Sequence, residues 1–210
     1  MSHIALQTVT GARNLVPILM LAFVWLSFET SLGLAQVSTA ITPTTGVGNL
    51  GTTVNTVGTA AQISGGTRPG NGTNLFHSFD QFNVGRPDTA QFLNTTPSLP
   101  TSNILGRVTS GNPSSIFGTI DTMSYPGANL FLMNPAGIVF GPTASLNVGG
   151  TATFTSADYF RLADNARFTA IPGPTDALLS TASITAFGFL GSTPGPITVR
   201  RAQGFDPGPP

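Results

Sequence analysis

The sequence predicts an all-β fold built from short strands, and three observations lead to it. First, 25 Gly and 17 Pro among 210 residues make one residue in five a poor fit for a helix interior. Second, only 8% of the residues are charged, against about 25% in an ordinary soluble domain, so long solvated helices are not expected. Third, from residue 103 onward, apolar runs of three to five residues alternate with turn residues, which is typical of short strands.

Residues 1–35 are expected to be a secretory signal peptide. An apolar run of twelve residues, 15–26, follows a polar stretch whose firm positive charge is Arg13. The run is too short for a membrane-spanning helix, which needs about 20 residues. Gly33 and Ala35 supply the small residues of a cleavage site, so we expect cleavage after Ala35 and a mature chain that begins at Gln36. An uncleaved membrane anchor is the alternative.

In the mature chain the predicted strands follow one another at short intervals. They end at turn sequences rich in Gly, Pro and Asn, and they cover residues 104–108, 116–120, 130–133, 138–140, 146–148 and 151–155. Short, evenly spaced strands form a sandwich, a barrel or a solenoid. Asn-Gly and Asp-Gly hairpin signals are missing between these runs, and Thr, Ser and Asn are abundant, which favours a solenoid of stacked coils.

Composition argues against several kinds of site. The formal net charge is zero, so the chain has no excess of positive charge to attract nucleic acid. The chain contains no Cys and two His, which excludes disulfide frameworks and argues against a zinc site. We therefore expect no cofactor, no metal ion and no nucleic-acid partner.

His77, Ser78 and Asp80 are the residues that most suggest a hydrolytic site. A catalytic triad needs three side chains that converge from different chain segments, which residues this close in sequence do not easily achieve. We instead expect a capping turn at the end of the coil stack, packed by the aromatic residues that recur at every third position, Phe76, Phe79 and Phe82.

Three stretches carry a resemblance to a known family. They are residues 63–84 (ISGGTRPGNGTNLFHSFDQFNV), 103–120 (NILGRVTSGNPSSIFGTI) and 129–150 (NLFLMNPAGIVFGPTASLNVGG). In order and spacing they resemble the filamentous haemagglutinin N-terminal domain, also called the two-partner secretion or haemagglutination-activity domain. Residues 41–54 are similar to that family's opening strand. The resemblance implies a right-handed parallel β-helix, a pectin-lyase-like solenoid with an N-terminal cap, over residues 36–200.

The resemblance also implies a function in secretion. Such a domain stands at the front of a large exported adhesin or exoprotein, which the general secretory machinery delivers to the periplasm of a Gram-negative-type envelope. There it is recognised by the periplasmic domains of an outer-membrane β-barrel transporter, and it then nucleates β-helix folding at the cell surface. The absence of Cys fits a route through a narrow pore, because a disulfide formed in the periplasm would close a loop that could jam.

The family motifs fall on fourteen positions, for which the resemblance implies a structural or transporter-recognition role and no catalysis. They are Asn74, Leu75, Phe76, His77, Phe79, Phe82, Asn129, Leu130, Phe131, Asn134, Pro135, Gly137, Phe140 and Gly141. The Asn-Pro-Ala-Gly turn departs from the family's Asn-Pro-Asn-Gly at Ala136, and Ser110 stands where a second Gly is usual. These departures affect local hydrogen bonding rather than the expected fold.

Two other classes of function remain as alternatives. A domain that itself binds surface glycans would use aromatic platforms, but the mature chain retains only Tyr125 and Tyr159 beside its phenylalanines. A β-helix enzyme acting on polysaccharides would need clustered carboxylates, whereas the Asp residues here are scattered and the chain has no Lys.

The C-terminal residues are expected to be the remnant of a truncated or split protein. The run 197–199 begins one more strand, after which the Pro- and Gly-rich tail 201–210 does not continue the pattern. We expect the edge of the last coil to be unprotected and able to pair with another chain.

Overall fold

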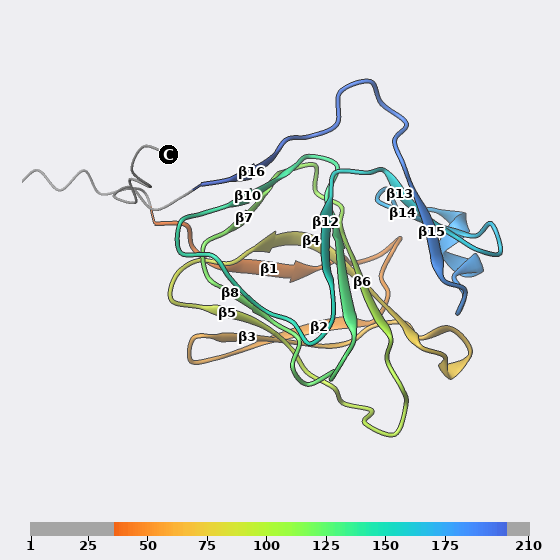
Figure 1. Cartoon of the computed structure of the whole chain (residues 1–210), viewed down its shortest axis with the longest axis horizontal. Coiled ribbons are helices and arrows are strands. Elements are labelled where there is room, and N and C mark those ends of the chain that lie inside the picture. The colour runs from red at the N-terminus through yellow and green to blue at the C-terminus, as the bar shows by residue number, and fades with distance from the viewer. Residues whose placement is uncertain (1–35, 201–210) are drawn as a thin grey trace, which may run out of the picture. The chain divides into compact units, whose positions relative to one another are not determined.

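The computed structural model describes residues 36–200, so the predicted signal peptide and the 201–210 tail lie outside the described residues. The described chain is all-β apart from two short 3₁₀ segments, η1 (Pro69–Asn71) and η2 (Pro174–Leu178), which confirms the predicted class (Figure 1). Between residues 36 and 200, no helix has the length and apolar character needed to cross a membrane.

Sheet A, one of two five-stranded sheets, is formed by strands that recur along the chain. Its strands lie in the order β1 (Ala40–Pro43), β4 (Asn74–Asn83), β6 (Asn103–Val108), β9 (Asn129–Met133) and β12 (Ala152–Thr155). All pairs from β4 onward are parallel. Asn74 lies opposite Asn103, which lies opposite Asn129, so equivalent residues of successive strands stand in register.

Two further sheets repeat the same stacking. Sheet B has the order β11 (Ser145–Asn147), β8 (Thr119–Asp121), β5 (Thr89–Phe92), β3 (Ala60–Gly65) and β2 (Thr52–Val57). Sheet C has the order β16 (Ile197–Val199), β10 (Ile138–Phe140) and β7 (Ser114–Ile116). The chain therefore contributes strands to sheets A, C and B in turn, first β6, β7 and β8 and then β9, β10 and β11. Each pass of the chain through the three sheets pairs in parallel with the pass before it.

The N-terminal end of the stack is built from antiparallel pairs. Strand β1 pairs antiparallel with β4, and β2 forms a hairpin with β3 whose two-residue turn is Gly58-Thr59. The sequence did not predict this hairpin, because a Gly-Thr turn is a weaker signal than Asn-Gly. Gly58 has a φ of 59°, a conformation that Gly adopts without steric cost.

A small antiparallel sheet interrupts the parallel pattern between β12 and β16. Sheet D has the order β14 (Arg167–Thr169), β13 (Tyr159–Leu162) and β15 (Ile184–Gly188). The turn between β13 and β14 contains Asn165 at a φ of 69°. Sheet D is an insertion that was not predicted from the sequence.

Most predicted strands are present with shifts of one residue at their ends, and 138–140 agrees at both ends with β10. The prediction for 116–120 was wrong, because this run contains a corner at Phe117-Gly118 that separates β7 from β8. A Cβ atom at Gly118 would overlap the carbonyl oxygen of Asp88, so this corner requires Gly. The run 197–199 forms β16 as expected and pairs with β10.

Two apolar clusters lie on opposite faces of sheet A. Phe79 and Phe82 belong to the larger cluster enclosed by sheets A, B and C, whereas Phe76 belongs to a second cluster shared with sheet D. Phe79 and Phe82 share a face despite their odd spacing because the β1–β4 register shifts at this point, where Asp80 is an extra residue. The predicted capping turn was therefore wrong: the three aromatic residues lie in the ten-residue strand β4.

Candidate functional site

A ladder of asparagine side chains joins the three stretches that carry the family resemblance. Asn103 Nδ2 donates to Asn74 Oδ1 at 2.9 Å, and Asn129 Nδ2 donates to Asn103 Oδ1 at 3.1 Å. Asn129 Oδ1 accepts from the Thr151 amide, while Asn74 Nδ2 donates to the carbonyl oxygens of Ser180 and Ala182. The ladder therefore connects four successive levels of the stack.

The Asn-Pro-Ala-Gly turn lies between β9 and β10. Asn134 is fully buried, and its Nδ2 donates to the Asn112 carbonyl at 2.9 Å and to Ser114 Oγ at 3.0 Å, both on the preceding pass of the chain. Asn134 Oδ1 accepts from the Ala136 amide at 3.0 Å. Gly137 has a φ of 109°, which disfavours any residue with a side chain. The turn keeps its hydrogen bonds although Ala136 replaces the family's Asn.

The remaining motif residues contribute mainly to packing. Among the apolar ones Phe131 is partly buried against the second cluster, and the others are buried: Leu75, Phe76, Phe79, Phe82, Leu130 and Phe140. Pro135 is partly exposed, and Gly141 lies under the Phe117 ring, where a Cβ atom would overlap the ring. The motifs are thus gathered in the interior of the folded stack, and they do not form one surface.

His77 lies in the interior with a single polar partner. Its ring packs near Phe79 and Phe92, with centroid distances of 5.9 and 5.5 Å. Thr52 Oγ1 accepts the Ser78 amide and lies 3.2 Å from His77 Nδ1, so its hydroxyl hydrogen is free to be donated to a neutral ring. Burial, and secondarily the positive charge of Arg68, lowers the pKa of His77 from 6.5 to about 3. His77 is therefore neutral at physiological pH.

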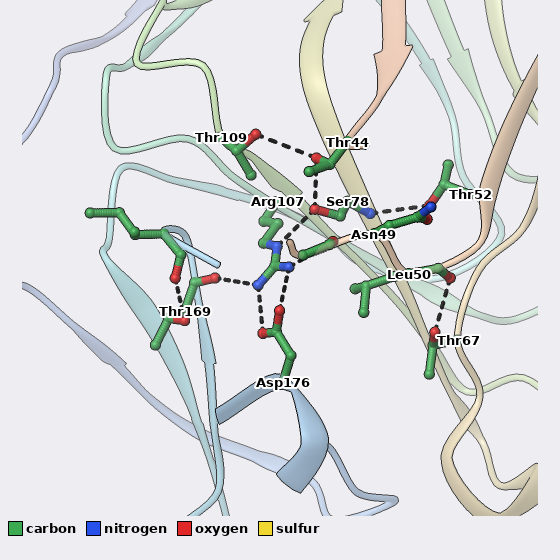
Figure 2. A network of polar contacts seen from close by, with 12 residues as sticks. Thr44, Asn49, Leu50, Thr52, Thr67, Ser78, Arg107, Thr109, Thr169 and Asp176 are labelled. Atoms are coloured by element: carbon green, nitrogen blue, oxygen red, sulfur yellow. Dashed lines mark hydrogen bonds and ion pairs between the residues drawn. The ribbon is translucent and has the colours of Figure 1, made fainter. Parts of the chain in front are cut away.

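Arg107 is the centre of a buried polar network (Figure 2). Its Nη1 and Nη2 atoms each donate to one carboxylate oxygen of Asp176 at 2.7 Å, a bidentate ion pair. The other donors reach Ser78 Oγ at 2.8 Å, the Thr169 carbonyl at 2.9 Å and the Gly48 carbonyl at 3.0 Å. All five N–H groups of the guanidinium are satisfied, as a fully buried charge requires.

The partners of Arg107 come from segments far apart in the sequence. Gly48 belongs to the loop before β2. Ser78 belongs to β4, Thr169 to β14 and Asp176 to η2 (Figure 2). Ser78 Oγ in turn donates to Thr44 Oγ1 at 2.9 Å. The network thus ties the N-terminal segment and sheet A to sheet D.

Asn103, Arg107 and Asp176 were not predicted from the sequence as site residues. Asn103 could have been found, because an Asn followed by Leu or Ile opens the three similar blocks at 74, 103 and 129. Arg107 carried a weaker signal, as a charge inside an apolar run of a chain with few charges. Its partner lies 69 residues away, and no local pattern identifies it.

The geometry offers no catalytic arrangement at the residues considered. His77 bonds Thr52, Ser78 bonds Arg107 and Thr44, and Asp80 is exposed to solvent, so the three side chains do not converge. Within the part of the chain that the structure describes, no three His, Cys, Asp or Glu residues are placed to hold a metal ion. The arrangement is that of a hydrogen-bonded structural framework.

Comparison with known proteins gives one family. A family model described as "TPS secretion domain" matches residues 39–203, which is most of the chain. The sequence matches none of the curated proteins with which it was compared. TPS secretion domains are targeting domains of two-partner secretion exoproteins, which cross the outer membrane with the help of a dedicated transporter. The matched length shows that the chain belongs to the family of TPS secretion domains, as its sequence motifs predicted.

Proposed function

We propose that this chain is the secretion-targeting domain of an exported adhesin or exoprotein, that the periplasmic domains of a cognate outer-membrane transporter recognise it, and that it nucleates folding at the cell surface. The family match over residues 39–203 carries this proposal. Residues 1–35 act as the signal peptide for the general secretory machinery, with cleavage after Ala35.

The stacked sheets act as the first coils of a right-handed parallel β-helix. Support comes from the three sheets, in which successive passes of the chain pair in parallel and in register. Antiparallel strands β1 and β2 close the N-terminal end, in the manner of a cap. At the other end, β11, β12 and β16 are the last strands of their sheets in the described chain, which leaves edges suited to receive a further coil.

The motif residues act mainly by shaping the folded stack. Their burial supports this role, because Asn134 and Phe76 are inaccessible to a partner once the domain has folded. Any contact of these side chains with the transporter therefore precedes folding.

Secretion with and without the transporter tests the function. The full chain is expressed in a Gram-negative host, and the protein in the medium and in the periplasm is measured with the cognate transporter present or absent. We expect extracellular protein only when the transporter is present. Equal export in both strains would overturn the proposal.

A pair of variants tests the role of the motif turn. Asn134→Ala removes both hydrogen bonds to the preceding pass, whereas Asn112→Ala changes an exposed side chain of the same type nearby. We expect Asn134→Ala to lower the amount of protease-resistant protein outside the cell and Asn112→Ala to leave it unchanged. Equal yields of protease-resistant protein from both variants would refute the structural role of the turn.

A further inference from the structure

Sheet D presents two arginines on its solvent face. Residues alternate along β13 and β14, so Phe160, Leu162 and Phe168 are buried while Arg161 and Arg167 are exposed. Arg161 and Arg167 are direct partners in the antiparallel pairing. Like charges directly opposite each other destabilise a sheet, so this placement needs an explanation other than stability.

The carboxylates nearest in sequence do not neutralise these arginines. Asp164 accepts the Ala166 amide at 3.1 Å, and Asp158 accepts the Leu190 amide at 2.6 Å. The ion pair found between residues 36 and 200 joins Arg107 to Asp176, in the interior. The described chain has six arginines, and two of them face each other without an acidic partner.

Both guanidinium groups are held in place and keep free donors. The Arg167 guanidinium lies over the Tyr159 ring, with its Cζ atom 4.5 Å from the ring centroid. That ring lies against Gly188 of β15, where a Cβ atom would overlap it. Arg161 donates to the side chain of Asn165. Among the described residues the Arg167 guanidinium has no hydrogen-bond acceptor, so its N–H groups are available to a ligand.

No long side chain of β15 encloses the two arginines. On β15 the residue opposite Arg161 is Ala186, and the position opposite Tyr159 is Gly188, over which the Tyr159 ring lies. An exposed face with two adjacent cations and no enclosing side chain fits a chain of repeated anionic groups better than a small ligand that needs an enclosing pocket. A polymer of repeated anions also keeps a second anionic group near the site when the first one is bound, which raises the effective concentration of ligand where each single contact is weak.

We propose that the exposed face of sheet D, centred on Arg161 and Arg167, binds acidic polysaccharide. The two guanidinium groups bind the carboxylate or sulfate oxygens of neighbouring sugar units, because planar guanidinium donates paired hydrogen bonds to such oxyanions. This activity goes beyond secretion targeting and does not depend on the transporter. It places an exported domain in contact with anionic glycans outside the cell.

Affinity electrophoresis with defined polymers tests the site. The purified chain is run at low ionic strength through gels that contain polygalacturonate, dextran sulfate, neutral dextran or polyglutamate. We expect retardation by one or both acidic polysaccharides, which separates the carboxylate source from the sulfate source, and none by neutral dextran. Stronger retardation by polyglutamate than by either polysaccharide would overturn the assignment to a glycan.

Charge-matched double variants provide the control. R161Q/R167Q removes the facing pair, and R86Q/R200Q removes the same charge at two other exposed arginines. We expect the first variant to bind about tenfold more weakly and the second to bind like the wild type. Equal loss in both variants, or no binding of the wild type to either acidic polysaccharide, would refute the site.

The stability of a single variant separates binding from folding. Arg161→Gln removes the repulsion between facing charges but keeps the contact of Arg167 with Tyr159. We expect it to weaken binding while leaving the thermal midpoint unchanged or higher. A lowered midpoint together with unchanged binding would show that Arg161 serves the fold alone.

Discussion

Lowering the pH from 7 to 5 is expected to destabilise the folded domain through His77. The unfolded chain binds a proton at this residue near pH 6.5, whereas the folded chain binds it only near pH 3. Below pH 6.5 the unfolded state therefore holds more protons, and stability falls as the pH is lowered until the folded pKa is reached. Above pH 6.5 the effect disappears.

The size of the effect follows from the two pKa values. For each pH unit between the two pKa values, the free energy of unfolding falls by about 1.4 kcal/mol. Because protonation of the unfolded chain sets in gradually around pH 6.5, the total loss between pH 7 and pH 5 is about 2 kcal/mol. Carboxylates contribute little in this window, because their ordinary pKa values lie near 4. His77 is the sole histidine between residues 36 and 200, which isolates the effect.

Urea unfolding followed by circular dichroism, at pH values from 5 to 7, measures this loss. His77→Asn keeps an acceptor for the Thr52 hydroxyl and removes the titration, so its stability should change little over the same range. NMR of the folded wild type should show an imidazole that stays neutral down to pH 5. A ring that titrates near pH 6.5 in the folded state, or an equal loss of stability in the variant, would refute this reasoning.

Three other substitutions test the framework by urea unfolding at pH 7. Asp176→Asn leaves the buried charge of Arg107 without its counter-charge, so it should lower the free energy of unfolding by about 3–5 kcal/mol. Asp80→Asn changes an exposed carboxylate and serves as the control, which should lower the free energy of unfolding little. Asn103→Ala interrupts the ladder and should lower the free energy of unfolding by about 1–3 kcal/mol. Asn55→Ala, at an exposed position, should lower it little, and equal losses in the two variants would contradict the ladder's role. Gly118→Ala places a Cβ atom against backbone oxygens and should lower the free energy of unfolding by at least about 1–3 kcal/mol. Gly173→Ala has free space around the new Cβ atom and should be tolerated. A Gly118→Ala protein as stable as the wild type would show that the corner adapts.

The sequence predicted what depends on local patterns. Apolar runs ending at Gly, Pro and Asn located β6, β9, β10 and β12, because strand length and turn chemistry are local properties. The Asn-Pro-Ala-Gly turn was found for the same reason, since Gly137 needs a conformation that few other residues adopt. The family followed from the order and spacing of these blocks.

Long-range pairing could not be predicted in the same way. Phe76 and Phe79 face different apolar clusters. Phe79 and Phe82 belong to the same cluster because of the register shift between β4 and β1, a strand some 40 residues earlier in the chain. Sheet D is a further case, because Phe168 packs on Phe76, Phe160 packs on Phe131, and the Thr169 carbonyl of β14 accepts a hydrogen bond from Arg107. Each of these contacts joins segments whose proximity arises only in the complete fold.

Those long-range contacts bear on how the domain folds if it leaves the cell with its N-terminus first. Arg107 lies in the second pass of sheet A, but its counter-charge arrives with Asp176, and the first ladder residue, Asn74, is completed only by the carbonyls of Ser180 and Ala182. In a chain exported only as far as β12, the groups that cover Arg107, among them Thr169 and Asp176, would be absent, and the second apolar cluster would lack its cover from sheet D. The early coils are therefore less stable alone than in the complete domain. If the chain is exported as proposed, we expect its N-terminal end to become stably folded only once sheet D and η2 are outside the pore.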